Sequence, residues 1–465
     1  MADRISLDYG RMLAGSSVGG RGITDEQLRA LAARFRDAYA DIERRRTAGE
    51  LGFFALPYER ETVDHIRSFA DGLGQAYDTI VVLGIGGSAL GTIALQNALL
   101  RPHWNELDGE ARDYFPRLYV LDNVDPSTIG PLLDRLDPRT TLYNVISKSG
   151  ATAETMAQFM IVRERLRAAL DDDHYRSHLI FTTDPERGVL RRLAAEEGIA
   201  TLPVPPNVGG RFSVLSAVGL LPAALAGIDI EALLAGAAAM DERCRTDDLF
   251  ANPAAMFAGL QHLADTEHAA SVHVMMAYTD RLYSIADWFR QLWAESLGKQ
   301  QDRSGAEVFR GPTPVKALGA TDQHSQVQLY IEGPFDKTIT FLTSRELPGD
   351  VAIPVIYDSV DELAYLGGRT LGELLDAERQ ATAAALASRG RMNMTIELPR
   401  IDAHSLGQLL MLLQIATVYA GALYGVDPLD QPGVELGKQL TYALMGRPGF
   451  EARLGADGGE RRVVE

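Results

Sequence analysis

The residues best suited to chemistry lie between Val145 and Met156, where the sequence is Val-Ile-Ser-Lys-Ser-Gly-Ala-Thr-Ala-Glu-Thr-Met. An apolar, strand-like stretch over residues 142–146 leads into a loop rich in hydroxyl side chains, and a helix is expected to begin near Glu154. The first turn of a helix has unpaired N–H groups and the positive end of the helix dipole, so it attracts anions. The pattern predicts a site for the phosphate of a small molecule, although a hydroxyl-capped turn without a ligand has the same composition.

A second loop of similar character follows the run over residues 79–83, which is predicted to be a buried parallel strand because it is apolar and β-branched. The next residues, 84–91, are Gly-Ile-Gly-Gly-Ser-Ala-Leu-Gly, in which glycines allow close approach to a ligand and Ser88 supplies a hydroxyl. The glycine spacing also fits a dinucleotide-binding loop loosely. The following strand, over 116–122, comes too late for the acidic residue of that motif, so we favour a sugar phosphate.

The composition argues against several classes of protein. The chain has 465 residues and a formal net charge of −18, which disfavours nucleic acid and anionic membranes as partners. Its one cysteine, Cys244, permits no intrachain disulfide and no thiolate metal site, as expected for a cytoplasmic protein. The first residues lack an apolar core, so we expect no secretory signal. The apolar stretch over 406–426 contains two glutamines and is expected to be a buried helix rather than a membrane span.

Apolar runs that alternate with helical segments predict an α/β fold. Five strands are expected in the first half, over residues 79–83, 117–121, 142–146, 178–182 and 200–204. In the second half we expect strands over 272–277, 327–331 and 338–342, and helices over 281–297, 360–389 and 405–425. The alternation predicts two doubly wound domains, each with a parallel sheet between layers of helices. Ligands of such sheets bind at the carboxyl ends of strands, where both phosphate-like loops lie.

Helical segments are expected at both ends of the chain. Residues up to about 74 have a mostly helical pattern with charged runs, and the length of the chain is ample for two domain cores. The predicted division is a helical N-terminal segment over 1–60, a first domain over 61–230, a second domain over 231–430, and a C-terminal helix and tail over 431–465.

Four further motifs carry a resemblance to a known family. They are Gly-Gly-Arg-Phe-Ser-Val-Leu-Ser at 209–216, Trp-Ala-Glu-Ser-Leu-Gly-Lys at 293–299, Thr-Asp-Gln-His-Ser at 321–325 and Gln-Pro-Gly-Val-Glu-Leu-Gly-Lys at 431–438. Together with the two loops above, and in this order from about residue 50 to 446, they resemble the phosphoglucose isomerase family, whose members interconvert glucose 6-phosphate and fructose 6-phosphate. The resemblance implies two sugar-isomerase (SIS-type) domains, a homodimer, no metal, no organic cofactor, and a role in glycolysis and gluconeogenesis.

The reaction itself sets requirements for the site. Moving a proton between C2 and C1 of a sugar needs one base that serves both carbons, and the enediolate intermediate needs a fixed cation. The resemblance assigns the base to Glu295 and the cation to Arg211. The helix of Glu295 places the carboxylate at the border of an apolar face, and Arg211 follows two glycines and precedes Ser213, a candidate helix cap. The alternatives are an exposed helix carboxylate and a surface arginine beside a turn.

A cyclic substrate also needs an acid–base pair that opens the ring. By resemblance this pair is His324 and Lys438, with Glu154 pairing with the histidine across a subunit interface, so that an isolated monomer would be inactive. His404 also precedes a serine, but it begins a long apolar helix, whereas His324 lies shortly after the 293–299 motif and before a predicted strand. For Lys438 the alternatives are solvation or burial beside Glu435.

The remaining substrate contacts are also implied by the resemblance. They are Gly87, Ser88, Ser147, Lys148, Ser149 and Thr152 on the phosphate side, and Gln291 and Gln431 on the sugar side. Many relatives have a threonine where this chain has Ala151, so one hydroxyl is lost here. Two other functions remain open: an isomerase that also accepts mannose 6-phosphate, and a non-catalytic sugar-phosphate sensor. The sensor would be expected to lack the base, the cation or the ring-opening pair, and all four residues are present.

Overall fold

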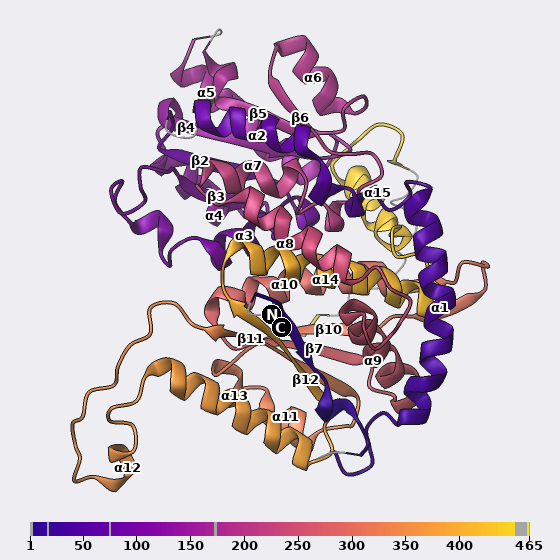
Figure 1. Ribbon diagram of the computed structural model, residues 1–465. Coiled ribbons are helices and arrows are strands. Elements are labelled where there is room, and N and C mark those ends of the chain that lie inside the picture. Colours follow the sequence, from indigo (N-terminus) through magenta and orange to yellow (C-terminus); the bar gives the residue numbers. More distant parts are fainter. Residues whose placement is uncertain (1–2, 16–17, 74–75, 172–173, 452–462, 465) are drawn as a thin grey trace.

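The computed structural model describes residues 3–15, 18–73, 76–171, 174–451 and 463–464. Its architecture is α/β, with two separate five-stranded sheets, each flanked by helices (Figure 1). The N-terminal part is largely helical, with α1 (Asp25–Thr47) and α2 (Arg60–Leu73). α1 begins at Thr24, whose side chain forms a capping box with Gln27, and its buried stripe packs against α14 and α9.

The first sheet is entirely parallel and confirms all five strands predicted for the first half. Its order is β3 (Arg117–Leu121), β2 (Thr79–Leu83), β4 (Thr141–Ile146), β5 (Leu179–Thr183) and β6 (Ala200–Pro203). The helices that follow these strands are α3 (Leu90–Leu99), α4 (Pro126–Arg135), α5 (Ala153–Ala169), α6 (Val189–Glu197) and α7 (Ala217–Leu225). Along β2, Ile80 and Val82 pack into one buried cluster while Val81 and Leu83 pack into another. Both faces of the sheet are therefore covered, as its predominantly apolar strands require.

The second sheet is mixed. Its order is β1 (Ser6–Asp8), β12 (Asn393–Arg400), β11 (Lys337–Glu346), β7 (Val272–Ala277) and β10 (Thr313–Leu318), and only β1 is antiparallel to its neighbour. The expected strands over 272–277 and 338–342 are confirmed, whereas β1, β10 and β12 were not anticipated. The N-terminal segment is thus not purely helical, because it supplies an edge strand to the sheet of the second half.

The strand predicted over residues 327–331 of the second half is wrong. Residues 327–331 form part of a helix, α11 (Val327–Glu332), in which Val327, Tyr330 and Ile331 face one buried cluster. The alternating run suits a strand, but the spacing of its apolar residues suits one helix face equally well. The helical region expected over 360–389 is confirmed and consists of α12 (Asp361–Ala364) and α13 (Leu371–Ser388), of which α13 has a capping box at Thr370.

Long helices connect the two halves. α10 (Asp280–Leu297) packs against α3 of the first half and against β10 and α14 of the second. α14 (Ala403–Tyr424) is long and apolar enough to cross a membrane, yet 94% of its most apolar window is buried inside the protein. It packs against α8 (Ile230–Arg243) and α9 (Pro253–His268), as expected of a core helix.

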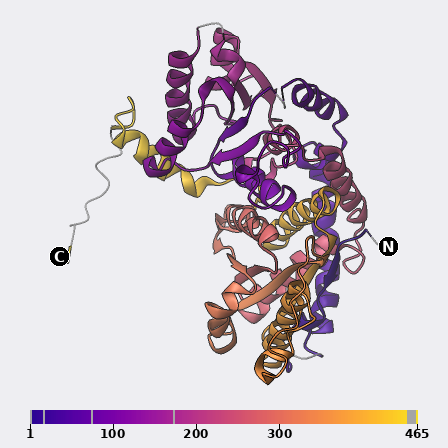
Figure 2. The ribbon, with the colours of Figure 1, turned by 90° about the vertical axis from the view of Figure 1, so that its left-hand side faces the viewer.

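The last helix, α15 (Glu435–Leu444), projects from the side of the molecule and buries only Ala443 (Figure 2).

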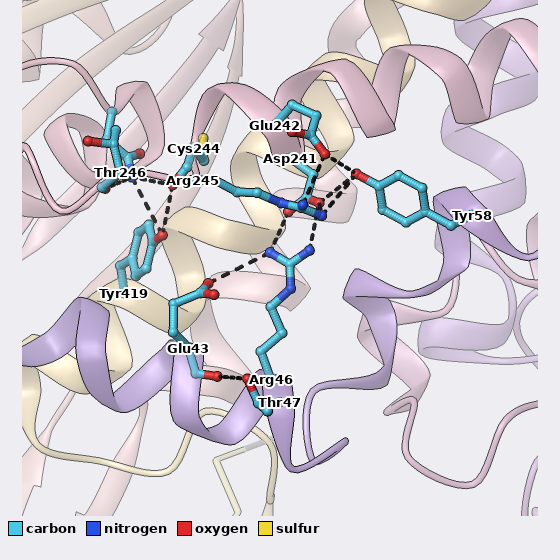
Figure 3. A network of polar contacts seen from close by, with 11 residues as sticks. Glu43, Arg46, Thr47, Tyr58, Asp241, Glu242, Cys244, Arg245, Thr246 and Tyr419 are labelled. Carbon is cyan, nitrogen blue, oxygen red and sulfur yellow. Dashed lines mark hydrogen bonds and ion pairs between the residues drawn. The ribbon is translucent and has the colours of Figure 1, made fainter.

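A buried ion cluster attaches α1 to α8 (Figure 3). Asp241 on α8 is 1% exposed, and its carboxylate accepts two hydrogen bonds from the Arg46 guanidinium at 2.8 and 2.7 Å. Arg245 donates to the same carboxylate at 2.9 Å, and the Tyr58 hydroxyl does so at 2.7 Å. These donors leave little of the carboxylate unsatisfied, which is the condition for burying a charge at tolerable cost.

Candidate functional site

Arg211 is the centre of a polar cluster between the two halves. It lies in the short helix η8 (Gly210–Phe212) and is 4% exposed. Its Nε donates to Ser296 Oγ at 2.7 Å, and its Nη1 donates to Glu295 Oε2 at 3.3 Å and to Gln431 Oε1 at 2.9 Å. Burial lowers the pKa of Arg211, and the nearby Glu295 carboxylate opposes that shift. Since these partners are 84 to 220 residues away in sequence, only the fold assembles the cluster.

Glu295 lies in the last turn of α10, between buried and exposed surfaces. Its side chain is 34% exposed, and Gln291, one turn earlier, donates from Nε2 to Glu295 Oε1 at 3.1 Å. The predicted apolar face of this helix is buried, which places the carboxylate at the border of the face as expected. A carboxylate that is oriented by two donors and still open to solvent can accept a proton from a bound molecule.

The loop after β2 approaches this cluster through glycines. A methyl group on Gly87 would lie 2.4 Å from the carbonyl oxygen of Gly210, so only glycine permits this contact with η8. Gly86 has a φ of +56°, and a methyl group there would lie 2.9 Å from Gln291 Nε2. Ser88, at the end of this loop, is half-buried. The glycines therefore bring the loop against the residues that hold Arg211 and Glu295.

The helix cap expected at Ser213 lies elsewhere. Ser213 closes η8, and its hydroxyl donates to the Gly210 carbonyl at 2.6 Å. The cap of α7 is Ser216, whose side chain accepts a hydrogen bond from Val218 N. The prediction was wrong by three residues because Ser213 and Ser216 have equal capping propensity. Ser213 ends the 3₁₀ turn over Gly210–Phe212, and α7 begins only after Ser216.

The hydroxyl-rich loop after β4 is arranged around the beginning of α5. The hydroxyls of Ser147 and Thr152 lie 2.9 Å apart, and Gly150 N donates to Ser147 Oγ at 3.1 Å. Thr152 is the residue before α5, but its side chain makes no capping hydrogen bond. Ser149 is exposed. β2 and β4 are adjacent parallel strands, so the two predicted phosphate loops leave the same edge of the sheet.

Lys148 connects this loop to the segment before Arg211. Its ammonium group donates to the carbonyl of Pro206 at 2.7 Å and to that of Val208 at 2.9 Å. Burial lowers the pKa of Lys148, and Asp184 opposes the shift. The lysine thus fixes the position of the 206–208 segment, which leads directly into η8.

The predicted ring-opening residues lie outside the Arg211 cluster. His324, in η9 (Thr321–His324), is exposed. Lys438, on α15, is also exposed rather than buried beside Glu435, and its ammonium pairs with Glu435 Oε1 at 2.7 Å. Glu154 is half-buried in the first turn of α5. Among the hydrogen bonds and ion pairs of the described residues, none joins His324 to Glu154 or Lys438 to Glu295.

Three residues of the cluster, Ser296, Lys299 and Asp430, were missed in the sequence. Ser296 positions the Arg211 guanidinium, as given above. Lys299 is 7% exposed; its ammonium donates to the Glu295 carbonyl at 2.9 Å and forms an ion pair with Asp430 Oδ1 at 2.8 Å. All three lie in or beside the motifs at 293–299 and 431–438. Their positions in or beside these motifs could have marked them as candidate site residues. Their roles could not be predicted, because they depend on contacts between distant segments.

The arrangement is suited to proton transfer on an anionic small molecule. It combines a reachable carboxylate, a buried guanidinium beside it, and a helix start flanked by hydroxyls. Across the described ranges of the chain, no group of three or more His, Cys, Asp or Glu side chains is placed to hold a metal ion. Glu295 and Arg211, which the structure brings together, are suited to acid–base chemistry by side chains.

Comparisons with known proteins agree with this chemistry. A family model described as phosphoglucose isomerase matches residues 59–455. A curated protein of Carboxydothermus hydrogenoformans named glucose-6-phosphate isomerase is 48% identical over 90% of this chain and 90% of its own length. A protein of Rubrobacter xylanophilus with the same name is 47% identical over 97% of this chain and 100% of its own length.

Solved structures extend the comparison to the fold. A hypothetical protein from Thermus thermophilus is 39% identical, and the match covers 95% of this chain and 100% of that protein with a TM-score of 0.84. A glucose-6-phosphate isomerase from Chlamydia trachomatis is 21% identical, and the match covers 93% of this chain and 89% of that protein with a TM-score of 0.79. At that identity the second likeness shows the fold alone.

Proposed function

Because this chain belongs to the phosphoglucose isomerase family, we propose that it interconverts glucose 6-phosphate and fructose 6-phosphate, with Glu295 as the base. The observation that carries the proposal is the Glu295 carboxylate, which is held by Gln291 and Arg211 and is still 34% exposed. Such a base can remove the proton from C2 and return it to C1 without a change of position. The product of the first step is a cis-enediolate, which carries the negative charge that Glu295 loses.

Arg211 is suited to stabilise that enediolate. Its guanidinium is fixed by Ser296, Gln431 and the backbone carbonyls of Pro428 and Asp430, so it needs no reorganisation when charge develops beside it. Its burial lowers the local dielectric response, which strengthens its attraction for a nearby negative charge. Gln291 and Gln431 flank the carboxylate and the guanidinium, where they can contact the sugar hydroxyls.

The phosphate group of the substrate is proposed to bind at the two loops after β2 and β4. The beginning of α5 offers backbone N–H groups and the positive end of the helix dipole. The residues proposed to surround the phosphate are Gly87, Ser88, Ser147, Lys148, Ser149 and Thr152. Lys148 adds a partly buried positive charge whose hydrogen bonds go to backbone carbonyl groups. These donors would orient the sugar toward Glu295.

The active form is proposed to be a cytoplasmic homodimer in which His324 of one subunit completes the site of the other and Lys438 assists ring opening. In the single chain, the side chain of His324 is exposed and Glu154, its proposed partner, is on another element. Both are then available to a second copy. A histidine paired with a carboxylate has a fixed tautomer and a higher basicity, as a ring-opening base requires.

A complementation experiment tests this arrangement. His324→Ala and Glu295→Gln subunits are refolded together and compared with each variant alone. If His324 acts across the interface, each mixed dimer has one intact site, and an equal mixture recovers about a quarter of wild-type activity. If His324 acts within its own chain, every site carries a defect and the mixture stays inactive.

The activity itself is tested by a coupled assay that follows conversion of fructose 6-phosphate to glucose 6-phosphate, with a chelator and no added metal. Turnover at an ordinary enzymatic rate supports both the reaction and a side-chain mechanism. Absence of turnover, with sugar phosphate still bound in a calorimetric titration, would favour a sensor instead.

A further inference from the structure

Lys299 follows the helix that carries Glu295, and all three hydrogens of its ammonium group are accounted for. The group donates to the Glu295 carbonyl at 2.9 Å and to the Asp430 carbonyl at 2.5 Å, and it pairs with Asp430 Oδ1 at 2.8 Å. The Lys299 side chain is 4% exposed, whereas that of Asp430 is 57% exposed. A buried lysine therefore connects the end of α10 to a segment at the surface.

Arg211 binds the same surface segment from its other side. Its Nη2 donates to the carbonyls of Pro428 at 2.5 Å and Asp430 at 3.0 Å, and its Nη1 donates to Gln431 Oε1. The Asp430 carbonyl thus accepts hydrogen bonds from both cations. The position of the 428–431 segment, and with it the position of Gln431, is set jointly by Lys299 and Arg211.

We propose that Lys299 is a positioning residue that acts through Asp430 to hold Gln431 and the Arg211 guanidinium in register with Glu295. The inference rests on the proposed roles of Glu295 and Arg211. A buried ammonium is costly to desolvate, and replacing such pairs by apolar groups is often neutral for stability, so stability alone is a weak reason for this pair. Its contacts instead connect the backbone of the base to the segment that orients the cation.

The consequence for catalysis is specific. The phosphate loops after β2 and β4 lie on other segments, so loss of Lys299 leaves phosphate binding unchanged. The interaction between Arg211 and the enediolate is weakened, because the carbonyls that fix the guanidinium move with the 428–431 segment. Misplacement of a catalytic group by about 1 Å can cost on the order of 100-fold in rate. The effect falls mainly on kcat, and the displacement of Gln431 from the sugar hydroxyls raises KM only slightly.

The test compares Lys299→Met, Asp430→Asn and the double variant. We expect kcat to fall about 10- to 100-fold in each single variant with KM changed less than about threefold, and the double variant to be no slower than the slower single one. Affinity for the hydroxamate of 5-phosphoarabinonic acid, whose planar group mimics the enediolate, is expected to fall by the same factor as kcat/KM. Inhibition by inorganic phosphate is expected to stay at the wild-type level.

Lys337 and Asp336 provide a matched control in the second sheet. Lys337 also has a buried side chain, 5% exposed, and pairs with a carboxylate that is 41% exposed. Lys337→Met and Asp336→Asn are expected to retain wild-type kcat and hydroxamate affinity, whatever they do to the melting temperature.

The proposal is overturned if folded Lys299→Met keeps kcat within about twofold of wild type, or if hydroxamate and phosphate affinity fall together. If Lys299→Met does not fold, Asp430→Asn decides alone, since it removes only an exposed carboxylate; unchanged kcat and hydroxamate affinity in that variant also overturn it. An inactive wild-type protein would instead contradict the proposed function. An active wild type with inactive Glu295→Gln and fully active Lys299→Met would contradict this inference only.

Discussion

The ion cluster around Asp241 and the one around Arg211 have opposite arrangements. Around Asp241 the carboxylate is the buried partner. Asp241 is 1% exposed, and its carboxylate accepts hydrogen bonds from Arg46, Arg245 and Tyr58. Around Arg211 the cation is the buried partner, and the Glu295 carboxylate that it contacts remains 34% exposed. Both clusters join distant segments, but only the second leaves a carboxylate within reach of a small molecule.

The difference distinguishes a structural cluster from a candidate catalytic one. A carboxylate buried among its own protein's donors stabilises the packing of α1 on α8 and cannot be reached by a substrate. A carboxylate with two donors and an open side keeps a lone pair for proton transfer, while the buried guanidinium supplies a fixed charge. Burial of the cation, combined with exposure of the base, is therefore the informative feature of the site.

The largest expected effect is that of Glu295→Gln. The substitution keeps the shape and the Gln291 contact but removes the proton acceptor, so kcat is expected to fall by about 10²- to 10⁴-fold or more while sugar-phosphate affinity stays near normal. Steady-state kinetics and calorimetric titration measure the two quantities.

Asp287→Asn is the control for this variant. Asp287 lies on the same helix but pairs with Arg290 and Lys316, away from the Arg211 cluster. Its removal is expected to leave kcat near wild type. Glu295→Gln with more than about a tenth of wild-type turnover would exclude Glu295 as the base.

Asp241→Asn is expected to have the opposite profile. Removing the charge leaves the Arg46 guanidinium, whose side chain is only 17% exposed, without its buried partner. The expected cost is about 3–5 kcal/mol in the free energy of unfolding. The folded protein should keep wild-type kcat. Urea denaturation measures the free energy of unfolding, and steady-state kinetics on the folded fraction measures kcat. A loss of kcat without a loss of stability would contradict a purely structural role for Asp241.

A smaller effect is expected from pH, through a buried histidine remote from both clusters. Burial, together with the nearby charges of Arg34 and Arg310, lowers the pKa of His262 to about 4. The unfolded chain, with a histidine pKa of about 6.5, binds the proton first as pH falls, so the stabilisation present above about pH 6.5 is lost toward about pH 4. At about pH 5 the free energy of unfolding is expected to be lower by about 2 kcal/mol than above pH 6.5 because of this histidine.

His262→Gln isolates this contribution. Its free energy of unfolding is expected to depend less on pH between about 7 and 5 than that of the wild type, by the same amount. Denaturation at the two pH values provides the measurement. Equal pH dependence in the two proteins would show that His262 is not held neutral by the fold.

The smallest expected effect is that of Ser149→Ala, at the exposed edge of the phosphate loop. Because this hydroxyl is exposed, water offsets much of its hydrogen bond to the phosphate, so we expect a loss of about 0.5–1.5 kcal/mol and a rise in KM of only about two- to tenfold with kcat unchanged. Ser304→Ala, in the turn between β8 (Lys299–Gln301) and β9 (Glu307–Arg310), is a control with no expected kinetic effect. A large fall in kcat for Ser149→Ala would place that hydroxyl at the reacting atoms instead.

The sequence by itself determined the first sheet and the identity of the chemically competent residues. The strands over 79–83 and 142–146 were predictable because nearly all of their residues are apolar or β-branched, as burial on both faces requires. Glu295, Arg211, Gln291 and Gln431 were identified by motif and are brought together in the fold. The roles proposed for them, and for His324 and Lys438, stay predictions.

Only the tertiary structure decided the other three strands of the second sheet, β1, β10 and β12, and the connections within the site. The apolar residues within 327–331 fit both the period of a strand and the period of a helix. Their packing against a buried cluster favours the helix. β1 and β12 pair although most of the chain separates them, which no local pattern records. The same is true of Lys299 and Asp430: a sequence shows that a lysine is present, but its burial and its partner depend on which distant carbonyl groups the fold places around it.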